Sequence, residues 1–276
     1  MLRGICGSWR QPVAYYFCES TIEAVALKKL LQNLTKEVIV AGLYPLAYIC
    51  DQGVTNQSAL KKLQDDTKEF QLRNNIECDN TILMEGYNIS VIYDPPHLLK
   101  GIRNNMLSKN LLFKGNVTRW DDILDLYYYD CGVGDIRMLP KLTDEHVVPE
   151  KIRKMKVRNC AQVLSARVAS ILRFTSSFSV REDGTAVSPT VKNTAAAVQF
   201  FDKLFDSCNG SRSGRCNGKL RGPVKESSEH VQFWYDSIKV LKDAKFASKS
   251  DENTIKIVPT LKNWVTTLQS LIRLTR

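Results

Sequence analysis

The sequence contains none of the short motifs that mark standard zinc or nucleotide sites. Its eight cysteines never form a C-x-x-C pair, so the ligand spacing typical of a structural zinc site is missing. It also has no G-x-x-x-x-G-K-[ST] loop and no G-x-G-x-x-G loop after a strand. Any nucleotide must therefore be held by a non-standard site.

Long hydrophobic runs are missing as well. The longest, such as Val38–Tyr44, are far shorter than the stretch needed to span a bilayer, so we expect no membrane partner. No charged-then-apolar leader precedes Cys6, and we find no secretory signal that would favour disulfides. We therefore expect a soluble intracellular protein with reduced thiols.

Acidic residues are outnumbered. The 276 residues include 39 Lys+Arg and 29 Asp+Glu, a net charge of +10. A basic excess favours polyanions such as DNA, RNA or nucleotides, although many soluble proteins with this balance bind no nucleic acid. The hydrophobic share of 43% is ordinary for a globular chain of one or two domains.

The first half of the chain alternates strand and helix patterns, which predicts an α/β arrangement up to about residue 115. The helices are expected at Ser20–Thr35, from about Asn56, and at His97–Leu112. The strands are expected at Gln11–Cys18, Val38–Cys50, Ile82–Met84 and Ile89–Tyr93, the last two as a hairpin or a single strand.

The second half has helical patterns only, and we predict that it is all-α. The expected helices are Pro149–Arg173, Thr190–Cys208, Ser227–Lys245 and Pro259–Leu274. The basic, Gly/Ser/Asn-rich stretch Ser207–Gly222 is expected to be a flexible exposed loop. The boundary between the halves is expected within Tyr129–Leu142.

Asp51 is the first candidate for chemistry. It follows a strand pattern and precedes a helix, the position at which open α/β sheets place functional groups. A carboxylate there can hold a divalent cation, and Asn56 can cap the helix or contact a ligand. The alternative is that Asp51 only forms a turn, with Gly53 supplying the tight bend.

Asp94 and His97 form a second candidate, within the run DPPHLLK. Proline near a helix start is favoured because its missing N–H is not needed there, and Asp94 is placed to cap that helix. One interpretation is a capped helix with a buried, hydrogen-bonded histidine. The other makes Asp94 and His97 a brace beside a metal or phosphate site.

Basic and polar side chains of the second half provide a third candidate. Lys141, Lys154 and Lys156 lie close to a helix start, where backbone N–H groups favour phosphate. Phe205–Asn209 offers an aromatic face for a base and polar groups for its edge or for a metal. The alternative is a solvated lysine face and a core phenylalanine.

The order of several longer motifs resembles the central part of P-element-type transposases, a group that includes relatives with a THAP domain. The motifs are AYICDQGVTNQSAL, VIYDPPHLLKGIRNN, KLTDEHVVPEKIRKMKVRNCAQVLSARVA, FFDKLFDSCN and VPTLKNWVTTLQSLIRL. They cover nearly the whole chain, and the DPPHLLKGIRNN block is highly specific.

The resemblance implies a ribonuclease-H-like α/β catalytic domain interrupted by a helical insertion domain that binds GTP. On this basis we expect an α/β plus all-α fold. Residues 1–135 would form part of the ribonuclease-H-like domain, and residues 136–276 the helical GTP-binding insertion domain.

In this family the first catalytic aspartate lies on the opening strand, the second follows the fourth strand, and a glutamate comes after the insertion. Asp51 matches the second aspartate and hence a ligand of catalytic Mg²⁺, with Asp94 and His97 as a structural brace. Pairing Asp51 with Asp94 as the first two acids leaves too few residues between them for the intervening strands. The first aspartate and the glutamate have no counterpart, so we expect a catalytically incomplete chain, because two-metal phosphoryl transfer needs several carboxylates.

The resemblance also implies the residues that contact GTP. Lysines would neutralise phosphate charge, the amide of Val157 would donate to phosphate, and Asp206 with Asn209 would read guanine. The full set carried over is Lys141, Lys156, Val157, Ser165, Phe205, Asp206 and Asn209.

These expectations leave three functions open. The first is a fragment of a DNA transposase (a polynucleotidyl transferase) that acts in the nucleus on transposon ends, with GTP and Mg²⁺ and as a possible homo-oligomer. The second is a domesticated, non-enzymatic module that binds GTP or nucleic acid. The third is a basic helical protein that contacts nucleic acid by charge alone.

Overall fold

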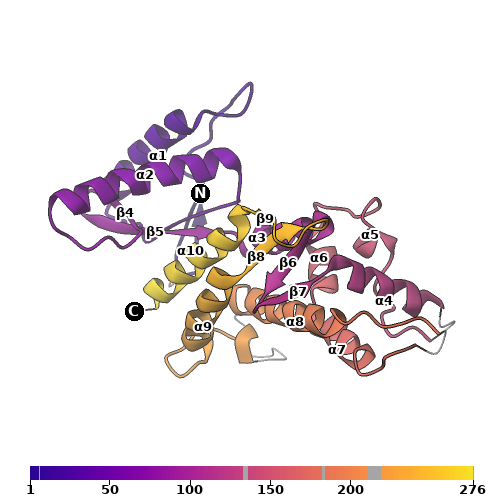
Figure 1. Cartoon of the computed structure of the whole chain (residues 1–276). Coiled ribbons are helices and arrows are strands. Elements are labelled where there is room, and N and C mark those ends of the chain that lie inside the picture. The colour runs from indigo at the N-terminus through magenta and orange to yellow at the C-terminus, as the bar shows by residue number, and fades with distance from the viewer. Residues whose placement is uncertain (6, 133–135, 182–183, 211–218, 276) are drawn as a thin grey trace. The chain divides into compact units, whose positions relative to one another are not determined.

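The computed structural model describes residues 1–5, 7–132, 136–181, 184–210 and 219–275. It consists of two compact units, Met1–Ile92 and Tyr93–Arg276, and Figure 1 shows the elements of each. In the described ranges, no helix combines the length and the apolar character needed to cross a membrane.

Unit 1 has two helices and a three-stranded sheet of order β3-β5-β4. Its elements are β1 (Leu2–Arg3), β2 (Arg10–Gln11), α1 (Ala24–Val40), β3 (Ala47–Cys50), α2 (Val54–Arg73), β4 (Ile82–Met84) and β5 (Tyr87–Tyr93). The small core is aliphatic, because Leu60 and Leu63 of α2 are buried together with Ile82, Ile89 and Val91 of the hairpin. Burial of these side chains is what holds α2 on the sheet.

The β4–β5 hairpin confirms the prediction for this segment. Met84 pairs with Tyr87 across the turn, and the two residues between them have positive φ, 47° for Glu85 and 83° for Gly86. A two-residue turn of this kind matches the right-handed twist of the flanking strands. The turn is local, so the sequence pattern was sufficient to predict the hairpin.

Two strand predictions in unit 1 were right only in part. Of the predicted strand Gln11–Cys18, only Gln11 is in a strand (β2, paired with β1), and residues 12–18 have no regular structure. Of the predicted strand Val38–Cys50, only β3 at its end is confirmed, because Val38–Val40 extends α1 with Leu34 and Val38 on one helical face. The helix ends at Val40, and Gly42 follows the C-cap with a φ of 80° that suits glycine.

Unit 2 is mainly helical with a four-stranded antiparallel sheet of order β7-β6-β8-β9. Its helices are α3 (Pro95–Ser108), α4 (Trp120–Gly132), α5 (Asp144–Val147), α6 (Val157–Val163), α7 (Ala166–Thr175), α8 (Val191–Cys208), α9 (His230–Asp243) and α10 (Pro259–Leu274), with a short 3-10 turn, η1 (Lys219–Arg221). Its strands are β6 (Lys109–Phe113), β7 (Asn116–Thr118), β8 (Lys245–Ser248) and β9 (Ile255–Lys256). The core includes large aromatic side chains, among them Trp120, Trp234 and Trp264.

The predicted helices near residues 190–208 and 259–274 are confirmed, but the helix His97–Leu112 is too long. Helix α3 ends at Ser108, and β6 begins at Lys109, which is extended. The strand pairs with β7 across a turn at Lys114 and Gly115, and with β8 more than a hundred residues later. This long-range pairing has no local signature, and it also makes the all-helical prediction for the second half wrong, since β8 and β9 lie there.

The single helix predicted for Pro149–Arg173 is two helices. Lys156 precedes the first turn of α6, and Leu164 leaves the helical conformation with ψ of 61°. Ser165 then caps α7, because its hydroxyl accepts a hydrogen bond from the Val168 N–H. Ser165 is a good N-cap residue, and it marks the start of a second helix that the hydrophobic periodicity alone did not reveal.

The predicted fold class is confirmed. The chain is a mixed α/β protein with a ribonuclease-H-like N-terminal part and a helical insertion. The packing units divide at residues 92–93. The division between catalytic and insertion domains that we expect at residues 135–136 concerns function rather than packing, and it stays a prediction.

Candidate functional site

The first turn of α7 and the C-terminal half of α8 are joined by a carboxylate. Helices α7 and α8 pack along each other (Figure 1), with Ala169 and Phe201 among their fully buried residues. Asp202 of α8 accepts a hydrogen bond from the backbone N–H of Ala166, the first residue of α7. Orphan N–H groups at a helix start favour an acceptor of this kind.

Asp202 is an acid in an unusual environment. Burial raises the pKa of its carboxyl to about 6, and the negative charge of Asp206 adds to the rise. The bond from Ala166 and the charges of Arg221 and Lys203 act in the opposite direction. Two carboxylates one helical turn apart repel each other, so one of them retains its proton more readily.

Asp206 forms an ion pair with Arg221 of η1. The Arg221 Nε lies 3.0 Å from Oδ1 of Asp206, whose side chain is 21% exposed. The guanidinium therefore faces both acids, Asp206 directly and Asp202 through its charge. The three side chains form what we call the acid–arginine cluster.

The position of η1 is fixed on several sides. A Cβ added to Gly210 would lie 2.8 Å from the carbonyl oxygen of Arg221, so the chain passes too closely there for any larger residue. His230 Nε2 is 3.0 Å from the Leu220 carbonyl oxygen. These two contacts present Arg221 beside Asp206. Lys219 Nζ is 2.6 Å from Glu229 Oε1, but both side chains are exposed, and such a surface ion pair adds little to the position of the turn. Of the predicted flexible loop Ser207–Gly222, residues 211–218 lie outside the described residues.

Two other predicted residues lie on the last turn of α8. Phe205 is half-buried, and Asn209 is the residue after the helix, exposed, with its backbone N–H bonded to the Phe205 carbonyl at 2.9 Å. Phe205, Asp206 and Asn209 therefore lie together, one turn beyond Asp202, which is bonded to the start of α7 where Ser165 is the cap. The hydroxyl of Ser165 also donates to the Gln162 carbonyl at 2.9 Å.

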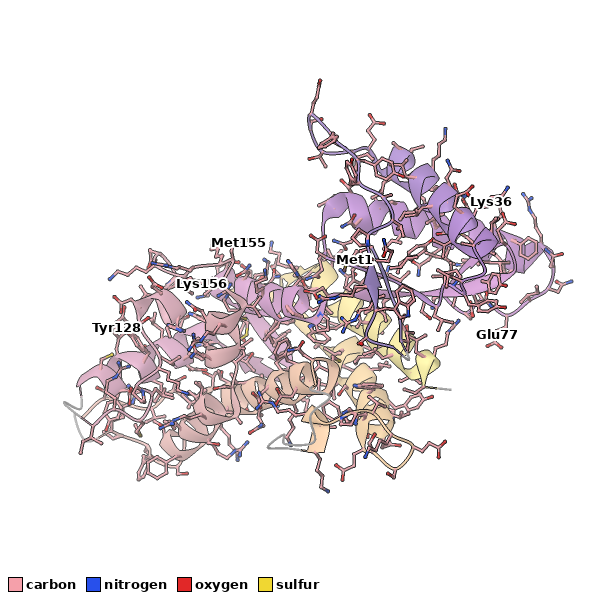
Figure 2. The ribbon with its side chains drawn as sticks, turned by 180° about the vertical axis from the view of Figure 1, so that it is seen from behind. Met1, Lys36, Glu77, Tyr128, Met155 and Lys156 are labelled. Atoms are coloured by element: carbon pink, nitrogen blue, oxygen red, sulfur yellow. The ribbon has the colours of Figure 1, made fainter. Side chains whose placement is uncertain are left out.

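Lys156 and Val157 lie at the start of α6, whose seven residues span about 10 Å at 1.5 Å per residue, whereas Ser165 follows the end of that helix. Lys156 is exposed beside Met155 (Figure 2), and its Nζ is 3.7 Å from Glu145 Oε2. Arg103 of α3, which is fully buried, donates to the Lys154 carbonyl at 2.7 Å and so anchors the segment before α6. Sequence analysis gave Arg103 no role.

Lys141 is exposed in the segment between α4 and α5. This segment is tied to the first turn of α7, because Arg167 Nε donates to the Met138 carbonyl at 3.0 Å. The structure thus places Lys141 in a segment bound to the helix that Ser165 caps.

Sequence analysis missed Asp202 and Arg221. A signal for Asp202 was available, because it precedes Asp206 by four residues and such a pair shares one helical face. Arg221 had no comparable signal, since the stretch around it reads as a loop. Only the contacts of η1 bring its side chain to Asp206.

Asp51 is exposed at the end of β3. Its Oδ1 accepts hydrogen bonds from the Gly53 N–H at 2.8 Å and from Asn56 Nδ2 at 2.7 Å. Its charge contributes, after burial, to raising the pKa of the Cys50 thiol to about 12. Asn56 thus contacts the acid itself, and Asp51 does form the turn described by the simpler interpretation.

The side chains around Asp51 do not form a metal site by themselves. Among the residues that the structure describes, no three His, Cys, Asp or Glu side chains gather closely enough to hold an ion. A pair of catalytic ions needs several carboxylates, so Asp51 would have to be joined by further acids in such a site.

Asp94 and His97 form a local pair in unit 2. Asp94 caps α3, since its Oδ2 accepts from the His97 N–H, and His97 Nδ1 is 2.6 Å from the same oxygen. The histidine is 41% exposed, so the expected buried histidine is wrong, while the expected cap is confirmed. A brace for a metal or phosphate site stays a prediction.

Two family models match separate parts of the chain. Residues 1–64 match the RNase H N-terminal domain of the TNP-like group, and residues 96–223 match the GTP-binding insertion domain of the same group. The second match contains the acid–arginine cluster and the predicted GTP contacts.

Two curated relatives are transposases. The transposable element P transposase of Drosophila melanogaster is 25% identical over 206 residues, which cover 75% of this chain and 24% of the relative. The human DNA transposase THAP9 is 24% identical over 233 residues, which cover 81% of this chain and 23% of the relative. The chain thus spans about a quarter of the length of these relatives.

The fold is similar to a solved structure, the Drosophila P element transposase strand transfer complex. The TM-score is 0.72 at 21% sequence identity, and the match covers 99% of this chain and 56% of the solved one. The two domain matches, both relatives and the fold thus agree that the chain is similar to P-element-type transposases over most of its length.

Proposed function

We propose that this chain is the GTP-binding part of a P-element-like DNA transposase. The observation that carries the proposal is the acid–arginine cluster within the match to the GTP-binding insertion domain. Guanine presents two adjacent N–H donors on one edge, and a carboxylate accepts both. A half-buried acid on a rigid helix is suited to that task, because it loses little entropy when it binds.

In this proposal Asp206 and Asn209 read the guanine edge, and Phe205 packs against the base. Lys141, Lys156 and the amide of Val157 serve the phosphates, and Ser165 adds a hydroxyl. Bound GTP would supply a polyphosphate charge that the exposed lysines complement.

The proposal assigns Asp51 a single role, as one of the acids that hold Mg²⁺ for DNA cleavage and strand transfer. Asp94 with His97 would brace the start of α3 beside such a site. Transposon-end DNA, a nuclear location and assembly into oligomers belong to the same proposal, since the relatives are DNA transposases. The net charge of +10 supports a DNA partner.

A second function is favoured by one observation: the acid–arginine cluster and the match to the GTP-binding insertion domain both lie in unit 2. A non-enzymatic GTP-binding module would need only this unit. Nicking of supercoiled DNA in Mg²⁺ separates the two functions, because only the transposase proposal allows it, and then only with acids from outside this stretch of chain.

Calorimetric titration with GTP and ATP tests the nucleotide proposal. We expect GTP to bind and ATP to bind at least about tenfold more weakly, since adenine lacks the donors that a carboxylate accepts. Equal affinity for the two nucleotides would show that Asp206 does not read the base. No binding of either at millimolar concentration would remove the proposal.

A further inference from the structure

Asp206 cannot read a base unless its carboxylate is held in one orientation. An aspartate on the last turn of a helix has two side-chain torsions, and rotation would turn its oxygens away from a ligand. Among the described residues, the ion-pair partner of Asp206 is Arg221, whose Nε lies 3.0 Å from Oδ1 of the acid. An arginine Nε–carboxylate contact is charge-assisted and directional, so it restricts that rotation.

Arg221 is itself held by the chain around it. A Cβ atom added to Gly210 would lie only 2.8 Å from the Arg221 carbonyl oxygen, so the two backbone segments are in close contact. His230 also contacts the neighbouring Leu220 carbonyl oxygen. The backbone that carries the Arg221 side chain is therefore held in place by these contacts. A fixed donor costs little conformational entropy each time it orients the acid.

Asp202 makes the arginine necessary. Two carboxylates on successive turns of α8 repel each other, and each would turn away if no cation lay between them. Lys203 on the same helix and Arg221 on η1 are the cations that face Asp202, while α7 contributes the Ala166 N–H. Arg167 of α7 is directed to the Met138 carbonyl instead.

We propose that Arg221 is a positioning residue that determines base specificity at this site. It fixes the Asp206 carboxylate so that the acid accepts both donors of a guanine edge, the ring N–H and the exocyclic amino group. Asp202 ties the same helical turn to α7. This inference rests on the proposed function. It adds to that function the residue that selects guanine over purines without the exocyclic amino group.

The test is a titration of the whole chain with GTP and with inosine triphosphate, which lacks the exocyclic amino group. Wild type should prefer GTP by about tenfold, the usual effect of one hydrogen bond to a charged group. In Arg221→Gln, GTP affinity should fall about tenfold and inosine triphosphate affinity about twofold, so the preference largely disappears. Arg221→Lys should restore only part of it, because an ammonium is not directional.

Lys219→Gln is the matched control. It removes the same charge from the same turn, but its side chain is 82% exposed and pairs with Glu229 rather than with Asp206. We expect it to leave the GTP preference unchanged. Gly210→Ala is a second variant that displaces η1 without changing any charge, and it should reduce the preference as Arg221→Gln does.

The outcomes separate the two claims. If wild type binds neither nucleotide, the proposed function fails. If wild type prefers GTP but Arg221→Gln weakens both nucleotides equally, Arg221 is only structural and this inference is overturned. It is also overturned if Arg221→Gln binds GTP more tightly than wild type, because Arg221 would then compete with the base for Asp206.

Discussion

The two units of the chain differ in how deeply their aromatic side chains are buried. In unit 2, Trp120, Trp234 and Trp264 are at most 1% exposed. In unit 1, Tyr15 and Phe17 are 81% and 93% exposed, and the buried hydrophobic residues described there are aliphatic or methionine. Aromatic side chains bury the largest areas, so unit 2 has the stronger hydrophobic core.

The candidate acids of the two units also differ in burial. Asp51 in unit 1 is exposed, and its carboxylate accepts hydrogen bonds from Gly53 and Asn56 of the turn that follows it. Asp206 in unit 2 is half-buried and paired with a residue from another element. A ligand site is held more rigidly when its side chains come from several fixed elements, and the acid–arginine cluster joins α8 and η1 in this way.

Removing a large aromatic from the core of unit 2 should give the largest effect. Trp120 is fully buried and its indole N–H donates to the Val147 carbonyl at 2.9 Å. Trp120→Ala should lower the free energy of unfolding by about 3–5 kcal/mol, because it leaves a cavity and an unpaired carbonyl. Denaturant unfolding followed by circular dichroism measures this change.

The matched control is Trp120→Phe, which keeps most of the volume and loses the hydrogen bond. It should cost about 1–2 kcal/mol. A loss below about 1 kcal/mol for Trp120→Ala would contradict the claim that unit 2 depends on its aromatic core.

Removing Asp206 should have the next largest effect. Asp206→Ala should weaken GTP binding about a hundredfold, because two donors of the base lose a charged acceptor. Asp51→Ala is the control and should leave GTP affinity within about twofold of wild type, since Asp51 belongs to unit 1. Calorimetry measures the GTP affinity of both variants. Similar losses of affinity would contradict the claim that the GTP site lies in unit 2.

Asp202 should make the stability of unit 2 depend on pH. Its pKa in the folded chain is about 6, above the value near 4 of an unfolded aspartate. The stability that its proton supplies is full below about pH 4 and is lost as the pH rises through about 6. Asp202→Asn, which carries no charge at any pH, should therefore gain about 1–2 kcal/mol at about pH 7.5 after allowance for partial exposure.

Unfolding of wild type and Asp202→Asn at several pH values measures this gain. It should shrink as the pH falls toward about 4, where both side chains are neutral. A gain that stays constant with pH would mean that packing, not charge, separates the two proteins.

Asp51 should give the smallest effect. Asp51→Ala removes two hydrogen bonds of an exposed turn and should lower the stability of unit 1 by less than about 1 kcal/mol. Hydrogen exchange of the α2 amides measures this loss. Robust Mg²⁺-dependent nicking by this chain that Asp51→Ala abolishes would refute the view that the acid supplies only one ligand.

Much of the fold could be predicted where the signal is local. The Glu85–Gly86 turn fixed the β4–β5 hairpin, and Asp94 with the following prolines marked the start of α3. Periodicity identified α8 and α10. It misassigned Val38–Val40 and Lys109–Phe113, because a short apolar run suits either a helix or a strand until a partner is known.

The candidate site was only partly predictable. The resemblance named Asp206, but it did not name Asp202 or Arg221. Asp202 shares a helical face with Asp206, so its neighbourhood follows from sequence spacing. Arg221 comes from the far side of a loop, and its approach to Asp206 depends on how Gly210 and His230 hold η1.

The sequence by itself determined the basic charge, the order of the family motifs, the helix caps and the tight turns, because each depends on neighbouring residues along the chain. Only the tertiary structure decided that β6 pairs with β8, that Asp202 lies against the start of α7, and that Arg221 forms an ion pair with Asp206. Burial and Coulomb forces act through space between segments far apart in sequence, and no local pattern records those distances.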